Sequence, residues 1–321
     1  MTCRICGNAR DNTTCSVREM MYGTRETFAY VQCAACGCIQ IAEIPDDMTP
    51  YYPPDYQGFK ASRRDKIRRS VNHPLKRWRY RYAVLNEGLL GRLLYAVSPA
   101  AKLRWLSYAG LTRGSRVLDV GCGAGSLLFK LREIGMTRLL GVDPYIEADI
   151  DWGNGLVIRK QRLEDVEGTW DCILFNHSLE HMPDQHGTIA LAEKRLAPDG
   201  VLVVLTPVVD GDGWKRYGVN WVGLDAPRHL YVHSHESLAR LLGAAGLGIT
   251  RVRCNTTAFN LWASEQYARD IPLHSPRSWA MDHEGSVFSQ ADMEAFKKRA
   301  RRLNAEGRGD QAIFYARRTS P

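Results

Sequence analysis

Residues 117–131 read Val-Leu-Asp-Val-Gly-Cys-Gly-Ala-Gly-Ser-Leu-Leu-Phe-Lys-Leu, and this run indicates the fold class more strongly than any other. The short apolar run ending in Asp119 predicts a buried parallel strand. Glycines at 121, 123 and 125 then predict a sharp turn into a helix. In α/β proteins such a turn follows the first strand and brings the backbone close to an adenosine-bearing ligand.

The glycine spacing separates two classes of adenosine ligand. A nicotinamide-type turn needs G-x-G-x-x-G, and counting from Gly121 its last position would be Ser126. Here the pattern is Asp-x-G-x-G-x-G, with Asp119 two residues before the first glycine. A carboxylate at that place would repel a pyrophosphate and attract a cationic, amino-acid-bearing ligand. S-adenosylmethionine (SAM) is such a ligand, and a plain strand-to-helix turn without a ligand is the alternative.

Strands and helices alternate after this turn. Further strands are predicted over 138–143, 156–158, 171–176 and 201–205, and helices over 126–134 and 184–196, with a turn at 197–200. Later residues predict a helix over 236–245, a strand over 247–254, a helix over 291–304 and a last, antiparallel strand over 311–316. This order predicts a doubly wound, mostly parallel, seven-stranded Rossmann-like sheet.

Several polar residues fall where such a sheet binds its cofactor. Asp143 ends the second strand about 20 residues after the glycine turn, where an acid accepts hydrogen bonds from both ribose hydroxyls. Asp165 is placed to accept from the adenine amine, although an acidic surface turn would have the same sequence. The candidate cofactor residues are Asp119, Gly121, Cys122, Gly123, Asp143, Pro144, Glu164, Asp165 and Asn176.

Two Cys-x-x-Cys pairs near the amino terminus predict a metal site. Cys3 and Cys6 form the first pair and Cys33 and Cys36 the second. Two such turns present four thiolates to one ion, and four protein ligands leave no open position, so the expected Zn²⁺ is structural. The segment is therefore predicted to be a zinc ribbon. Cys38 is an alternative to Cys36.

Size and composition restrict the class of protein further. The chain has 321 residues and a net charge of +8, and no run approaches the ~20 apolar residues of a membrane span. We expect a cytoplasmic protein, because its start lacks a signal peptide and its paired cysteines favour metal over disulfides. Residues 60–81 carry ten Lys and Arg against one Asp, which favours a phosphate-bearing partner or a solvated helix face.

The chain resembles class I SAM-dependent methyltransferases, within the branch that bears an amino-terminal zinc ribbon and acts in bacterial glycan and sugar biosynthesis. The resemblance rests on both Cys-x-x-Cys pairs, Tyr51-Tyr52-Pro53-x-Asp55-Tyr56, the glycine turn, Asp143, Leu179-Glu180-His181 and residues 221–231. We predict a zinc ribbon over 1–45, a linker and basic helical insert over 46–112, and a SAM-binding domain over 113–321. Acceptor-binding elements are expected at about 207–235 and 255–290.

The resemblance implies that the protein binds a methyl acceptor. The sequence contains candidate catalytic residues and candidate acceptor-binding residues for it. A hydroxyl acceptor must lose its proton, a task that suits His near neutral pH. The candidate catalytic residues are His229, His181 and Glu180, and the candidate acceptor-binding residues are Asp225, Arg228, Tyr231 and Tyr56.

The expected substrate is a sugar or glycan hydroxyl in a nucleotide- or lipid-linked, phosphate-bearing intermediate. The basic residues of 60–81 add the expectation of a peripheral contact with the anionic inner face of the membrane. An RNA methyltransferase is the second interpretation, and nucleic acid is the less favoured partner. A non-catalytic SAM-binding scaffold is the third interpretation.

Overall fold

The computed structural model describes residues 1–53, 74–99 and 101–319, and a mixed eight-stranded sheet crosses this part of the chain. In sheet order its strands are β11 (Leu247–Cys254), β12 (Gln311–Arg318), β9 (Leu196–Pro207), β8 (Trp170–Asn176), β4 (Val117–Val120), β5 (Leu139–Val142), β7 (Val157–Arg159) and β6 (Ile150–Asp151). The five strands from β9 to β7 are parallel, and β12 enters antiparallel to β9 as the sequence predicts.

The predicted number of strands was one too small. The extra strand, β6, pairs antiparallel with β7 at the sheet edge through only two residues, which is too short for a periodic pattern to appear in the sequence. The prediction of a separate turn at 197–200 was also wrong. These residues lie within β9, where its pairing with β8 shifts from Trp170–Leu196 to Cys172–Val201.

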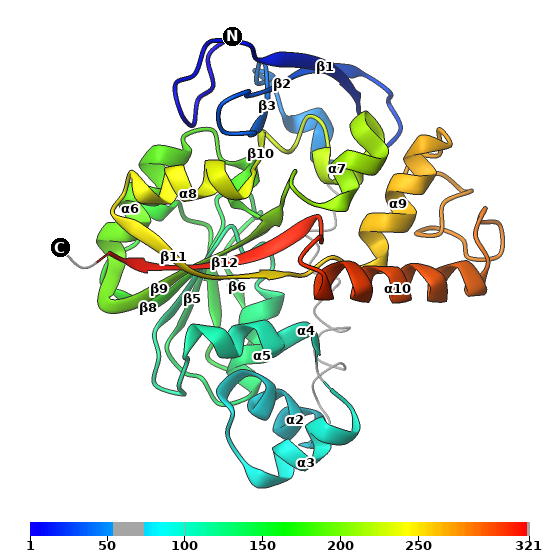
Figure 1. Ribbon diagram of the computed structural model, residues 1–321. Helices are drawn as coiled ribbons and strands as arrows, with labels where there is room; N and C mark the ends of the chain where they lie inside the picture. Colours follow the sequence, from blue (N-terminus) through cyan, green and yellow to red (C-terminus); the bar gives the residue numbers. More distant parts are fainter. Residues whose placement is uncertain (54–73, 100, 320–321) are drawn as a thin grey trace.

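Helices cover both faces of the sheet (Figure 1). The predicted helices correspond within about two residues to α5 (Ser126–Glu133), α6 (Gln185–Arg195), α8 (His235–Gly243) and α10 (Gln290–Ala305). Cys172 to Phe175 in β8 are all buried, because a central parallel strand has helices on both sides. Two further helices, α7 (Asp212–Tyr217) and α9 (Ala258–Ala268), lie in the regions expected to bind the acceptor.

The amino-terminal residues form a second sheet that is joined to the rest of the protein. Its order is β1 (Thr13–Arg18), β2 (Thr27–Gln32), β3 (Ile39–Ile41) and β10 (Tyr231–Val232). Strand β10 comes from the segment predicted to bind the acceptor, and it pairs antiparallel with β3. One hydrophobic cluster runs from Cys3 and Ile5 to Leu118 in the main sheet. Figure 1 shows this second sheet at one end of the molecule.

The helical insert lies at the opposite end of the molecule (Figure 1). Its described part contains α2 (Pro74–Leu85), α3 (Leu89–Val97), α4 (Ala101–Arg104) and a 3₁₀ turn, η2 (Trp105–Ala109). Most of the basic run, residues 60–73, lies outside the described residues. Two of its remaining cations face the main domain, because Arg77 pairs with Glu133 and Arg81 Nε donates to the Ile134 carbonyl at 3.0 Å. Among the described residues, no helix combines the length and apolarity needed to span a membrane.

Candidate functional site

The glycine turn requires its glycines. Gly121, Gly123 and Gly125 all have positive φ, between 54° and 74°, a region that side chains with a Cβ rarely occupy. A Cβ on Gly121 would lie 2.5 Å from the Ser178 Cβ, so the loop after β4 packs directly against the loop after β8. Ser178 Oγ fixes this contact by donating to the Val120 carbonyl at 2.6 Å. The turn is thus held open for a ligand by backbone shape.

Two buried carboxylates flank this turn. Asp143 accepts hydrogen bonds from the backbone N–H of Gly123 and of Tyr145, both at 2.9 Å. Asp119 Oδ1 is buried and has no hydrogen-bond partner among the described residues. Burial, reinforced by the charge of Asp143, raises the pKa of Asp119 to about 8. A cationic ligand near Asp119 would stabilise its ionised form.

A cavity of about 740 Å³ opens over the turn. Seven of the nine predicted cofactor residues line it: Gly121, Cys122, Gly123, Asp143, Pro144, Glu164 and Asn176. Asp119 and Asp165 are not among the lining residues. Tyr52, Tyr145 and Gln161 also line the cavity and were not among the predicted site residues. Tyr52 belongs to the tyrosine–proline segment of the linker, the one sequence signal that pointed to it.

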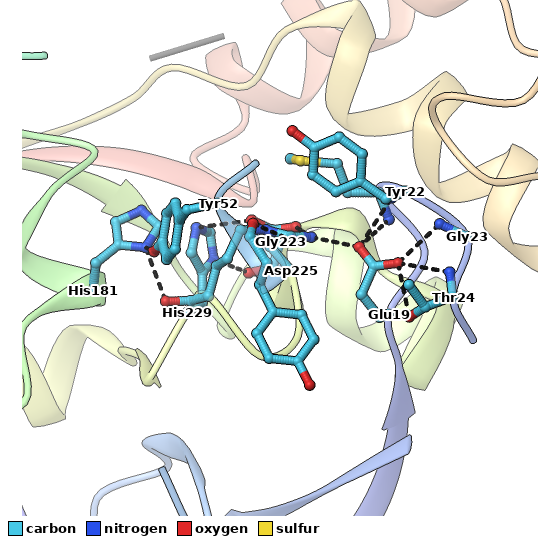
Figure 2. A network of polar contacts seen from close by, with 12 residues as sticks. Glu19, Tyr22, Gly23, Thr24, Tyr52, His181, Gly223, Asp225 and His229 are labelled. Atoms are coloured by element: carbon cyan, nitrogen blue, oxygen red, sulfur yellow. Dashed lines mark hydrogen bonds and ion pairs between the residues drawn. The ribbon is translucent and has the colours of Figure 1, made fainter. Parts of the chain in front are cut away.

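The two predicted histidines lie together beside this cavity. Their ring centroids are 4.8 Å apart, and His181 lines the cavity wall. His181 Nδ1 lies 2.8 Å from the Arg228 carbonyl and 3.1 Å from the Tyr52 hydroxyl, while His229 Nδ1 lies 2.8 Å from the Gly223 carbonyl. Figure 2 shows Tyr52, His181 and His229 next to one another. Burial and the charge of His229 lower the pKa of His181 to about 4, so its ring is neutral at pH 7.

The third predicted catalytic residue, Glu180, lies close to both histidines. Its carboxylate is fully buried, with Oε1 at 3.3 Å from His177 Nδ1 and Oε2 without a hydrogen-bond partner among the described residues. Burial by itself would raise the pKa of Glu180, but the hydrogen bond and charge of His177 lower it to about 2. Sequence reasoning therefore predicted residues that the structure brings together, while their catalytic roles stay predictions.

The structure does not bring Arg228 to an acceptor. Its guanidinium is fully buried and donates to Asp225 at 2.7 and 3.0 Å and to Glu19 at 2.9 Å. Burial acts to lower the pKa of Arg228, but the two carboxylates raise it further above its ordinary value. Arg228 was expected to bind an acceptor phosphate or carboxylate because no neighbouring residue in the sequence points to Glu19, which lies 209 residues away.

Glu19 is itself held by a tight loop. Its two carboxylate oxygens accept the backbone N–H groups of residues 21–24 at distances from 2.8 to 3.1 Å. Figure 2 shows Glu19 and this loop on one side of Asp225 and the histidines on the other. The polar contacts therefore run from the amino-terminal sheet to the cavity wall.

The other acceptor-binding candidates are placed as follows. Asp225 faces Arg228, and its Oδ2 lies 3.9 Å from His229 Nε2. Tyr231 is buried and donates to the Pro183 carbonyl at 2.9 Å, so its hydroxyl is occupied by the loop after β8. Tyr56 lies outside the described residues.

The four cysteines of the two pairs come together. Cys3 Sγ lies 3.7 Å from Cys36 Sγ, Cys6 Sγ lies 3.5 Å from Cys33 Sγ, and all four sulfurs are within 4.8 Å of one another. Tetrahedral Zn²⁺ with bonds of about 2.3 Å separates its sulfurs by about 3.8 Å, so the donor set fits that ion. Cys38 lies outside the cluster, with its Sγ 3.6 Å from the Ile39 carbonyl. The alternative ligand set with Cys38 is therefore wrong.

Comparison with known proteins agrees with this geometry. Residues 94–252 match the family model described as "Methyltransferase domain". These residues form a SAM-dependent methyltransferase domain. The methyltransferase domain includes the glycine turn, Asp143, Glu180 and both histidines.

Several curated proteins are similar to parts of this chain. A ubiquinone biosynthesis O-methyltransferase of Xanthomonas oryzae pv. oryzae is 29% identical over 131 residues, which are 35% of this chain and 51% of that protein. A magnesium-protoporphyrin O-methyltransferase of Synechocystis is 24% identical over 166 residues, covering 48% of this chain and 72% of that protein. The chain spans about half the length of the ubiquinone-pathway relatives.

Two further comparisons concern a tRNA enzyme and a solved structure. A tRNA U34 carboxymethyltransferase of Alteromonas mediterranea is 28% identical over 115 residues, which are 31% of this chain and 35% of that protein. A solved SAM-dependent methyltransferase from Mesorhizobium loti aligns with 69% of this chain and 100% of its own, at 16% identity and a TM-score of 0.44.

Proposed function

We propose that this protein transfers the methyl group of SAM to a hydroxyl of a sugar or glycan intermediate that is linked to a nucleotide or a lipid. One observation carries the proposal. The same cavity is lined by the glycine turn with Asp143 and by Tyr52 with His181. A cofactor bound along the turn and an acceptor bound against His181 would meet inside it.

The cofactor half of the cavity supplies binding groups for each part of SAM. We assign Asp143 and the Gly123 backbone to the ribose side, Glu164 to the adenine side, and the buried Asp119 carboxylate to attraction of the methionine moiety. Asp119 does not line the cavity, so its effect would be the charge it places under the turn. Gly121 and Gly123 would let the ligand approach the backbone closely.

The acceptor half of the cavity would orient the acceptor hydroxyl and remove its proton. Methyl transfer from a sulfonium is an in-line displacement, so the protein mainly aligns donor and acceptor and excludes water. His181 and His229 are the groups beside the cavity that could take the hydroxyl proton. The names of the ubiquinone and magnesium-protoporphyrin relatives, both O-methyltransferases, favour oxygen as the accepting atom.

We further propose that Cys3, Cys6, Cys33 and Cys36 hold a structural Zn²⁺. Four thiolates leave no coordination position for substrate, so the ion would contribute stability and would not take part in methyl transfer. The chemistry at the cavity would then come from residues of the methyltransferase domain.

A peripheral contact with an anionic membrane surface is proposed for the helical insert. Leu89, Leu93 and Val97 of α3 expose 58% or more of their surface along one helix face, and Arg92 is exposed beside them. An apolar face beside an exposed cation suits the boundary between anionic headgroups and acyl chains. This contact would bring a lipid-linked acceptor near the protein.

RNA is the second candidate acceptor, favoured by the net charge of +8 and by the similarity to a tRNA enzyme. The test compares cells that produce the wild-type protein with cells that produce Asp119→Ala. Intact-mass analysis of cell-surface glycans and of RNA follows, with exposed Asp199→Ala as the matched control. A glycan that loses one methyl mass in Asp119→Ala alone supports the proposal, and a methyl missing from RNA contradicts it.

A further inference from the structure

We propose that Glu180, His181 and His229 hold a divalent transition-metal ion at the cavity wall, and that this ion binds the acceptor hydroxyl. One donor atom from each residue lies within 4.8 Å of the other two. This inference rests on the proposed methyltransferase function, since it concerns how the same cavity handles its acceptor. It gives the histidines the role of ligands instead of proton acceptors.

The two histidines are oriented as metal-ligating histidines usually are. Each Nδ1 lies 2.8 Å from a backbone carbonyl, Arg228 for His181 and Gly223 for His229. Because a carbonyl oxygen can only accept, each Nδ1 must carry the proton, and each Nε2 is left with a lone pair. A ring held through one nitrogen by a backbone carbonyl is the common arrangement around a metal bound through the other nitrogen, and His229 Nε2 also has Asp225 Oδ2 at 3.9 Å.

Glu180 supplies an independent observation. Its Oε2 is fully buried and has no hydrogen-bond partner among the described residues, while Oε1 faces only His177 at 3.3 Å. A buried carboxylate oxygen without a partner is costly, and a bound cation would remove that cost. Glu180 and His181 are adjacent in the sequence, whereas His229 is brought next to them only by the fold.

The balance of buried charge also calls for a cation. The polar network at the cavity wall contains the carboxylates of Glu19, Glu180 and Asp225, each at most 9% exposed at the side chain. Within this described network, Arg228 is the one permanently charged cation. Three carboxylates against one guanidinium leave an excess of negative charge in a low-dielectric region, where unpaired charge is expensive. A divalent ion would neutralise it.

The donor set indicates the class of ion and its chemistry. Two imidazoles and one carboxylate suit first-row divalent ions such as Mn²⁺, Fe²⁺ or Zn²⁺ and leave coordination positions open. An acceptor hydroxyl bound there would lose its proton to solvent more easily. The oxygen would then form a bond to the SAM methyl carbon while the carbon–sulfur bond breaks. The electron pair of that bond goes to sulfur, leaving S-adenosylhomocysteine.

Metal binding by the full-length protein tests the proposal. Wild-type protein that contains one zinc per chain is dialysed against increasing Mn²⁺, and its metal content is measured. We expect one Mn²⁺ per chain in addition to zinc, and at least tenfold weaker Mn²⁺ binding in Glu180→Gln and in His229→Ala. Exposed His283→Ala is the matched control and should bind like wild type. Absence of Mn²⁺ from wild type, or equal binding by all variants, would overturn the proposal.

A second measurement uses only the wild-type protein, so its result does not depend on whether the variants fold. Pulsed electron paramagnetic resonance of Mn²⁺-loaded wild type should show two directly coordinated imidazole nitrogens, and their absence contradicts the proposed ligands. SAM binding by calorimetry and methyl transfer are recorded in parallel. Methyl transfer without Mn²⁺ binding refutes the metal site alone, whereas Mn²⁺ binding without methyl transfer to any acceptor refutes the proposed function alone.

Discussion

Replacing Asp119 by Asn should change how the stability of the SAM-free protein depends on pH. In the folded wild-type protein, burial and the charge of Asp143 raise the pKa of Asp119 from 3.8 to about 8. The folded protein therefore holds the proton of this carboxyl group more tightly than the unfolded chain does. The stabilisation is fully present below the unfolded pKa and is lost as pH rises through the folded pKa. One pKa unit corresponds to about 1.36 kcal/mol, so the wild type should lose about 4 kcal/mol relative to Asp119→Asn between pH 5 and pH 9.

Urea denaturation of both proteins at several pH values measures this difference. The free energy of unfolding of Asp119→Asn should fall less steeply above pH 5, and the curves should become parallel above pH 9. Curves that stay parallel throughout would refute the raised pKa. SAM binding reports the same group, because a cationic ligand favours the carboxylate. At pH 7 wild type should release a proton on binding SAM, measured by calorimetry in two buffers, and Asp119→Asn should not.

The other predictions concern the four-cysteine zinc site, the ion pairs of Arg228 and the contact of Asp143 with the ribose of SAM. Cys36→Ser should lose its zinc and lower the melting temperature, whereas Cys38→Ser should keep one zinc per chain by elemental analysis. Glu19→Ala should lower the free energy of unfolding, measured by urea denaturation, by about 3–5 kcal/mol, because it leaves the buried Arg228 with one carboxylate partner. The control, exposed Glu236→Ala, should lower it by under about 1 kcal/mol. Equal losses in the two variants would contradict the role of Glu19 in this ion-pair network. Asp143→Ala should weaken SAM binding in calorimetry at least tenfold, and unchanged affinity would argue against its ribose contact.

The elements predicted from sequence are those whose cause is local. The strand at 247–254 and the helix at 291–304 were predicted within one residue, because alternation and capping act within a few positions of the chain. The glycine turn was identified for the same reason. Its positive φ values are a property of three nearby residues.

What the sequence could not predict depends on contacts between distant segments. Arg228 was assigned to an acceptor because its partner Glu19 lies in the amino-terminal sheet. Tyr231 shows the same effect, since its hydroxyl reaches Pro183 across 48 residues. A buried arginine and a substrate-binding arginine look alike in sequence, and only the carboxylate that faces the guanidinium separates them.

The amino-terminal sheet contacts the chain segment around His229, which lies beside the cavity. Tyr30 in β2 donates to the His229 carbonyl at 2.9 Å, and Ser234 Oγ donates to the Cys36 carbonyl. Strand β10, which begins two residues after His229, pairs with β3. The segment that carries this histidine is therefore in contact with the cysteine-bearing end of the chain, whereas the glycine turn packs against the loop after β8. We therefore predict that removal of the proposed zinc disturbs the position of His229, on the acceptor side of the cavity, before it disturbs the glycine turn.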